Sequence, residues 1–271
     1  MAEKRGRPRA NLDWDDEDVL PPVLSRDTEF VFRRMTEETL KAVEARAPHR
    51  VLDVGCGRGI DALALIWQGG ILFGCEPSRV MLHKAKEGAK NSRGVFRLVS
   101  SLAEDLPFAH RAFHRVFCKG AIDHFLDPDQ AVAEMCRVAS PEGKVIISVA
   151  NFESLSCFLA RGLDRLARRI SGRGIPPPHI WKIPRDHTYK FDHPTLLGLA
   201  GKYLRVESVR GVSLLWGFPW WARVLNRIPQ IMALILLRCL DKIASWRPGW
   251  GDVLVVVGRP RNQFPGDERS S

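Results

Sequence analysis

The stretch VLDVGCGRGID, residues 51–61, decides the fold of this chain. Its apolar start, interrupted by Asp53, reads as a short buried strand, and three glycines, Gly55, Gly57 and Gly59, follow. A strand that runs into a glycine-rich turn is typical of the first unit of a doubly wound α/β sheet, where ligands bind at that turn. The missing side chains at Gly55 and Gly57 let backbone N–H groups approach a ligand closely.

Alternating apolar and amphipathic segments continue this unit along the chain. Apolar runs predict seven strands, at 51–54, 71–75, 95–99, 115–118, 144–150, 204–209 and 252–258. Helical spacing predicts an entry helix within 29–47 and further helices at 58–68, 78–89, 128–138 and 194–202. Short apolar strands separated by amphipathic helices indicate a mostly parallel sheet covered on both faces.

The composition fits one globular unit. A chain of 271 residues can bury a full core without disulfides, and its six cysteines show no CxxC pair and no Cys/His ligand spacing. We therefore expect a reducing, cytoplasmic location and no metal site, with no secretory signal and no membrane span. We expect a disordered charged tail over 1–22, a domain over 23–259 with cap insertions at 151–192 and 212–250, and a second disordered tail over 260–271.

The acid in the glycine turn indicates which ligand the turn binds. A dinucleotide fingerprint has the spacing GxGxxG, but position 60 is Ile and the third glycine comes one position early. A carboxylate at Asp53 repels a pyrophosphate and attracts an ammonium group. Glu76 ends the second strand in LFGCEPS, where such folds place a carboxylate on ribose hydroxyls. An amino acid joined to a ribose describes S-adenosylmethionine (SAM), whose carboxylate would meet the backbone N–H groups of the turn.

Four segments carry a resemblance to a known family: LDVGCGRG (52–59), GCEPS (74–78), SSLAEDLPF (100–108) and EMCRVASPEGKVIISVAN (134–151). They resemble the class I SAM-dependent methyltransferases, and within them the small-molecule group of ubiquinone and menaquinone biosynthesis, over roughly 45–150. The resemblance implies a Rossmann-like methyltransferase fold of seven strands with the last antiparallel, SAM as cofactor, and methyl transfer to a small molecule.

The resemblance also implies a cofactor site. Asp53, Gly55 and Gly57 would hold the methionine end, and Glu76 would hold the ribose. The full set of expected cofactor-binding residues is Asp53, Gly55, Cys56, Gly57, Gly59, Glu76, Pro77, Ser101, Leu102, Ala103, Cys118 and Lys119. In it, the turn at 101–103 would hold the adenine, and residues 118 and 119 would line the methionine side through backbone groups. This chain departs from the family at Leu102, where an acid often meets the adenine amino group.

Three residues are candidates for catalysis. His124 in GAIDHFLDP follows the fourth strand, and His187 and Tyr189 in PRDHTYKFDHP lead into the helix after the fifth. A histidine exchanges protons readily near neutral pH, so His124 could take a proton from an acceptor that carries one. The alternative is a solvated turn histidine beside Asp123, and a plain loop role for the other two.

The two insertions bear on the acceptor. SLSCFLARGLDRLARRI (154–170) has an apolar stripe with arginines opposite, and residues 216–246 are more apolar still, with tryptophans and flanking arginines. One interpretation is core packing on the sheet. The other is a lid over a small hydrophobic or lipid-linked acceptor, in peripheral contact with an anionic membrane surface.

Two further interpretations come from other functional classes. The net charge of +10 indicates an anionic partner, and KRGRPR (4–9) resembles an AT-hook, an arm that inserts arginines into the minor groove of DNA. One copy beside an acidic run is weak evidence for nucleic-acid binding. The chain could also be a non-catalytic subunit with a SAM-binding fold. The sequence gives no indication of oligomeric state.

Overall fold

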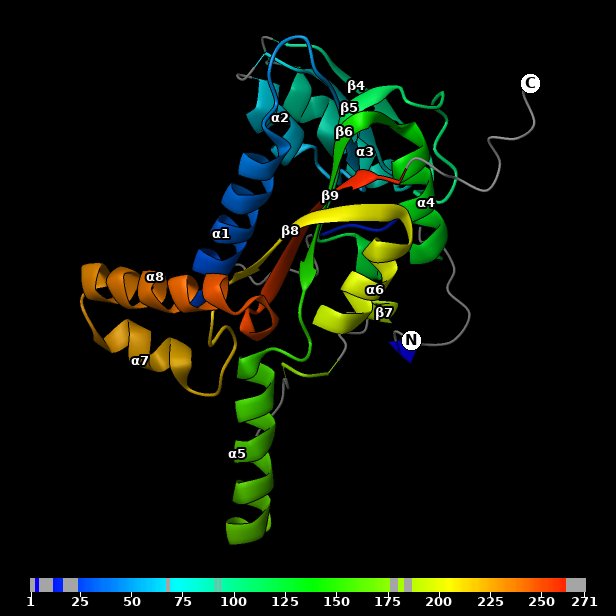
Figure 1. Ribbon diagram of the computed structural model, residues 1–271. Coiled ribbons are helices and arrows are strands. Elements are labelled where there is room, and N and C mark those ends of the chain that lie inside the picture. The colour runs from blue at the N-terminus through cyan, green and yellow to red at the C-terminus, as the bar shows by residue number, and fades with distance from the viewer. Residues whose placement is uncertain are drawn as a thin grey trace.

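One seven-stranded sheet organises the protein. The computed structural model describes residues 3–4, 12–16, 24–66, 69–90, 92, 94–175, 180–182 and 187–261. The strands are β2 (Arg50–Val54), β3 (Ile71–Cys75), β4 (Phe96–Val99), β5 (Phe113–Lys119), β6 (Ala139–Ala150), β8 (Leu204–Val212) and β9 (Val253–Pro260). Their order is β4-β3-β2-β5-β6-β9-β8 (Figure 1). β9 runs opposite to the other six strands of this sheet, which confirms the predicted fold class.

Helices cover both faces of the sheet. The helices of one side are α1 (Arg26–Val43), α2 (Ile60–Ile66) and α3 (Arg79–Ala89), and those of the other are α4 (Pro128–Val138) and α6 (His193–Tyr203). Local sequence explains where α4 and α6 begin. Asp127 accepts N–H bonds of the first turn of α4, and Asp192 does the same for α6. A proline follows each of these caps, where its missing N–H costs nothing.

Alternating side chains of the central strands divide the core into two layers. Val116 and Cys118 of β5 pack with residues of α4 and α6, whereas Phe117 packs with residues of α1 and α2. β6 begins at Ala139, earlier than the predicted Lys144, because Ala139 pairs with Phe113 ahead of a register shift between Phe113 and Arg115. Because the strands β2 to β6 run parallel, their carboxyl ends meet at one edge of the sheet.

The two insertions form helices outside the sheet. The first contains α5 (Leu155–Ser171), which extends away from the body as a single helix (Figure 1). The second contains two helices, α7 (Trp221–Arg227) and α8 (Gln230–Trp246), separated near Pro229, which cannot continue a helix from the preceding turn. They pack on α1 through Phe30, Leu225 and Leu237.

The N-terminal segment makes contacts that the sequence did not predict. β1 (Glu3–Lys4) pairs with β7 (Tyr189–Lys190) in a separate two-stranded sheet. In contrast to the expected disordered tail over 1–22, residues 12–16 contact α3 and the glycine turn. Residues 5–9 of the AT-hook-like arm and residues 262–271 of the second predicted tail lie outside the described residues. The domain boundaries remain predictions. No described helix is long and apolar enough to cross a bilayer.

Candidate functional site

The glycine turn has a backbone that only glycine adopts easily. Gly55, Gly57 and Gly59 have φ angles of 72°, 52° and 71°. A Cβ atom on Gly55 would lie 2.6 Å from the Cβ atom of Ala121, so a side chain would clash there. Gly55 therefore allows the turn to approach the segment that follows β5.

Backbone N–H groups of this turn are already paired within the protein. The N–H groups of Gly55 and Cys56 donate to the Cys75 carbonyl at 2.9 and 3.0 Å, and Gly59 donates to the Cys56 carbonyl at 2.8 Å. Gly57 donates to the Glu76 carboxylate at 3.0 Å. The bonds from Gly55, Cys56 and Gly57 tie the turn to the end of β3 and to Glu76. That N–H groups of this turn bind a ligand carboxylate stays a prediction.

Glu76 joins the glycine turn to the start of α3. Its Oε2 accepts from Gly57, and its Oε1 accepts from the Ser78 N–H at 2.9 Å. The side chain is buried, and burial raises its pKa, although the two backbone bonds oppose this. Its predicted contact with a ribose remains a prediction.

Asp53 is a buried carboxylate beside other carboxylates. Burial, followed by the charge of Asp61, raises the pKa of Asp53 well above its usual range; Lys119 opposes this rise and Glu76 adds to it. Lys119 itself lies 2.8 Å from Asp61 and donates to Thr36. A cationic group bound beside Asp53 would therefore compensate negative charge that the protein compensates only in part.

The structure brings the other expected cofactor residues to the same edge of the sheet. Ser101 follows β4, and its hydroxyl lies 3.1 Å from the Cys75 thiol at the end of β3. Cys118 is fully buried near the end of β5. The remaining expected residues, Cys56, Pro77, Leu102, Ala103 and Lys119, lie in or directly after β2, β3, β4 and β5. Their roles stay predictions.

Residues 12–16 lie over this edge and were missed as site residues. The Ser78 hydroxyl donates to the Trp14 carbonyl at 2.6 Å, and Asp15 lies 2.6 Å from the Lys84 ammonium. Asp16 pairs with Arg58 of the glycine turn. The acidic run at 13–18 was the available signal, but the sequence does not say which basic residues it meets.

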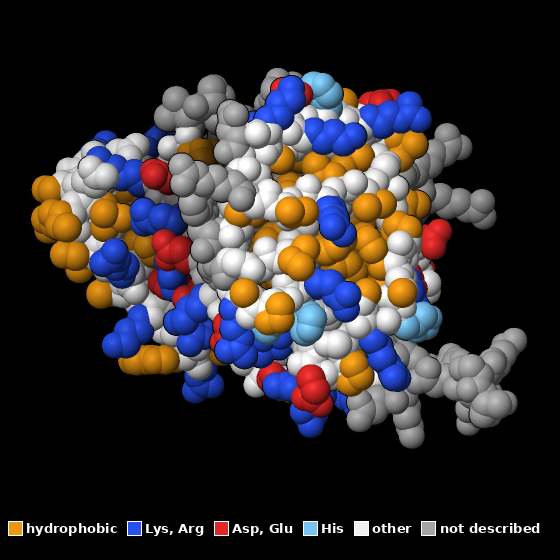
Figure 2. Space-filling view, turned by 90° about the horizontal axis from the view of Figure 1, so that it is seen from above, with side chains coloured by type: hydrophobic (Ala, Val, Ile, Leu, Met, Phe, Trp, Pro, Cys, Tyr) orange, Lys and Arg blue, Asp and Glu red, His pale blue; other side chains and the backbone are white. Residues whose placement is uncertain are grey.

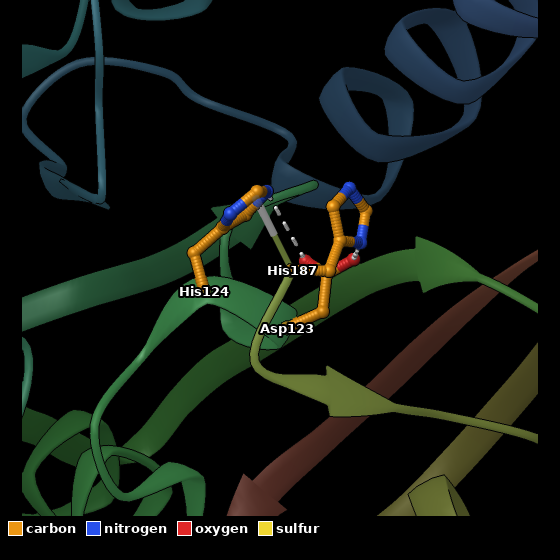
Figure 3. Close-up of side chains that lie close together, drawn as sticks. All are labelled: Asp123, His124 and His187. Carbon is orange, nitrogen blue, oxygen red and sulfur yellow. Dashed lines mark ion pairs between the residues drawn. The ribbon is translucent and has the colours of Figure 1, made fainter. Parts of the chain in front are cut away.

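Two candidate catalytic residues lie together around a buried acid (Figure 3). Asp123 and His124 belong to the short helix η1 (Ile122–His124) after β5, and His187 comes from the segment before β7. Asp123 Oδ2 lies 2.7 Å from His187 Nδ1, and Oδ1 lies 3.9 Å from His124 Nε2. The two imidazole rings are 4.3 Å apart at their centroids. The Thr188 N–H donates to the Asp123 carbonyl at 2.8 Å and fastens the two segments.

This cluster can do two kinds of chemistry. A carboxylate 3% exposed beside two imidazoles can stabilise the positive charge of a ring that has taken up a proton. The ligand atoms of Asp123, His124 and His187 also lie within 4.8 Å of one another, so they could hold a metal ion, which the sequence did not predict. Tyr189 has a different position, since its hydroxyl donates to the Leu126 carbonyl at 2.8 Å.

Comparisons with known proteins find methyltransferases among the relatives of this chain. Residues 52–147 match the family model described as "Methyltransferase domain". The chain is 32% identical over 138 residues to "Methyltransferase GfsG" of Streptomyces halstedii, covering 50% of this chain and 48% of that protein. It is 32% identical over 163 residues to "Demethylmenaquinone methyltransferase" of Shouchella clausii, covering 56% and 68%. The chain thus spans about half the length of the first relative.

A solved structure shares the fold. The PH0226 protein of Pyrococcus horikoshii superposes with a TM-score of 0.58, and the match covers 92% of this chain and 100% of that one. The two sequences are 20% identical, so this likeness concerns the fold alone. It is the same Rossmann-like architecture that the alternation of strands and helices predicts.

Proposed function

Because the chain belongs to the class I SAM-dependent methyltransferase family, as the four sequence segments indicated, we propose that it transfers the methyl group of SAM to a small apolar acceptor. The relative named "Demethylmenaquinone methyltransferase" supports an acceptor of the quinone type. Because a compound of that type partitions into membranes, we propose that the methyl transfer takes place at a membrane surface.

The residues at the sheet edge fit the cofactor. Asp53 offers a buried carboxylate to the ammonium group, and the αL backbone at Gly55 and Gly57 leaves the turn without side chains that would block the methionine end. Glu76 presents carboxylate oxygens for the ribose hydroxyls. When bound, SAM supplies a methyl group activated by a positively charged sulfur, so the protein has to position and desolvate the acceptor.

The chain's own contribution to the chemistry is a proton acceptor. Transfer to a hydroxyl oxygen leaves a proton to be removed, and we assign this step to His124. Its side chain is 29% exposed, compared with 17% for His187, so it is the more accessible ring. Asp123 stabilises the protonated ring, and His187 is positioned by the same carboxylate. The observation that carries this assignment is the buried Asp123 between two imidazoles directly after β5.

The test combines turnover with SAM binding. Purified protein is incubated with methyl-labelled SAM and a panel of apolar phenols and hydroxyquinones. For an acceptor that is methylated, His124→Gln should lower kcat by roughly 10²- to 10⁴-fold and leave the Kd of SAM unchanged. His110→Gln, at an exposed loop position, is the matched control and should behave as the unmodified enzyme.

Three outcomes count against parts of the proposal. Unchanged kcat in His124→Gln removes the base. Loss of turnover with a chelator and its return with a divalent cation would instead assign Asp123, His124 and His187 to a metal. SAM binding without methyl transfer to any member of the panel, in single-turnover assays, favours the non-catalytic subunit.

A further inference from the structure

The apolar stripe of α5 faces away from the protein. The buried side of α5 is formed by Cys157, Ala160 and Asp164, and Asp164 accepts from the Ile175 N–H in the segment that follows the helix. With 3.6 residues per turn, the opposite side carries four large apolar side chains that are 42–77% exposed: Phe158, Leu159, Leu166 and Ile170. Core packing, which the sequence left open, therefore does not account for these four.

α8 has the same organisation. Ala233, Leu237 and Ala244 are buried on its inner side. Its outer side carries six exposed apolar residues: Ile231, Met232, Ile235, Leu236, Ile243 and Trp246. Exposed apolar side chains gathered on one face of a helix, unlike single ones, mark an interaction surface.

In both α5 and α8 the acidic residues and the exposed basic residues lie on different sides of the helix. Their acids lie on the inner sides, where Asp164 pairs with Arg168 at 2.9 Å and Asp241 pairs with Arg34 at 2.9 Å. The exposed cations beside the apolar residues are Arg165 and Arg169 of α5, and Arg238 and Lys242 of α8. Figure 2 shows hydrophobic side chains interspersed with Lys and Arg at the end of the molecule that carries α7 and α8. The outer surfaces thus combine apolar groups with positive charge.

This combination fits an anionic bilayer better than a second copy of the chain. Two copies docked through these faces would bring arginines together, and like charges repel. An anionic bilayer accepts the apolar side chains into its acyl boundary and the cations among its headgroups. Lys242 and Arg247 lie over the rings of Trp246 and Trp250, at 5.7 and 5.9 Å from the centroids, an aromatic and basic combination typical of the membrane interface.

We propose that the outer faces of α5 and α8 bind the surface of an anionic phospholipid bilayer. The inference rests on the proposed function in one respect, since binding to a bilayer would bring the enzyme to an acceptor that resides in the membrane. The surface itself is independent of catalysis, because none of its residues belongs to the cluster of Asp123, His124 and His187 or to the glycine turn.

Vesicle sedimentation tests the proposal without SAM or acceptor. Full-length protein is mixed with vesicles of phosphatidylcholine, with or without phosphatidylglycerol. We expect retention by the anionic vesicles, weakened by added salt. Leu166→Ser with Ile170→Ser should lower the partition coefficient by roughly tenfold or more, and Arg165→Glu with Arg169→Glu should lower it by a similar factor. Val95→Ser and Arg205→Glu, at exposed positions outside the two helices, are the matched controls.

Each result bears on the surface. Losses in the α5 variants, with control variants and far-ultraviolet circular dichroism unchanged, support the proposal. Absence of binding to anionic vesicles, equal binding by the α5 variants, or equal losses in the controls overturns it. A concentration-dependent dimer that both α5 variants abolish, without vesicle binding, shows an interface between copies and also overturns it. An inactive enzyme that still binds vesicles refutes the proposed function alone.

Discussion

Replacing Asp53 by asparagine removes the carboxyl group near the end of β2, ahead of the glycine turn, and keeps the size of the side chain. In the proposed site this carboxylate meets the ammonium group of SAM. A hydrogen bond to a charged group contributes about 1.5–3 kcal/mol, so the Kd of SAM should rise by roughly 10- to 150-fold in Asp53→Asn.

The same substitution should not weaken the fold. Burial and neighbouring carboxylates raise the pKa of Asp53, so its ionised form is unfavourable in the protein without ligand. A raised folded-state pKa means that stability is lost as pH rises through it. Asparagine removes that loss, so the free energy of unfolding of the variant should equal or exceed that of the unmodified protein above the raised pKa. Weaker binding together with unchanged or greater stability is therefore the expected result.

Calorimetry with two ligands locates the contact. S-adenosylhomocysteine has the same ammonium group but lacks the charged sulfur, so Asp53→Asn should weaken both ligands by similar factors. The affinity of the unmodified protein for SAM should rise with pH as Asp53 loses its proton, until the ligand's own ammonium begins to titrate. This rise should be absent in Asp53→Asn. Asp252→Asn is the matched control, since Asp252 is also fully buried but lies at the start of β9.

Two results would refute this reasoning. An unchanged Kd for both ligands means that the carboxylate does not meet the amine. A loss for SAM alone places Asp53 at the sulfur instead. If the variant unfolds at lower denaturant concentration than the unmodified protein, the argument from burial is also wrong.

Three further substitutions test the site and its surroundings. Gly55→Ala should lower the free energy of unfolding by about 2 kcal/mol or more, measured by urea titration, because φ is positive and the new Cβ would clash with Ala121; unchanged stability would contradict the geometry of the turn. Glu76→Gln should cost about 1–3 kcal/mol in the same assay, since one amide oxygen cannot accept from both backbone donors; an unchanged urea midpoint would contradict these bonds. Burial raises the pKa of Asp252 to about 7, so the unmodified protein should lose stability as pH rises toward neutrality, by roughly 1.4 kcal/mol for each unit by which the folded-state pKa exceeds the unfolded one. This loss should be smaller in Asp252→Asn, and identical slopes in a pH series of thermal unfolding would contradict it.

Local signals in the sequence were sufficient for the scaffold and for the outline of the cofactor site. Strands followed by amphipathic helices predicted seven strands in the observed places, and helical spacing at 128–138 predicted α4. The glycines and the acids Asp53 and Glu76 lie at strand ends, and parallel strands bring their carboxyl ends to one edge. These features could be predicted because each depends on neighbours within one or two turns of the chain.

Contacts between distant segments could not be predicted in this way. The sequence proposed His124 and His187 separately, and only the fold places both beside the buried Asp123. It also treated residues 12–16 as part of a tail, although Trp14 lies over the start of α3. Such contacts form between groups that are far apart in sequence, so no local sequence pattern predicts them.

The sequence by itself determined the fold class, the order of the strands along the chain, the glycine turn and the existence of apolar stripes in the two insertions. Only the tertiary structure decided which way those stripes face. A period of 3.6 residues shows that a helix has an apolar side, but burial depends on what the rest of the chain places against that side. In α5 and α8 small and acidic residues are buried, and the large apolar side chains are left exposed.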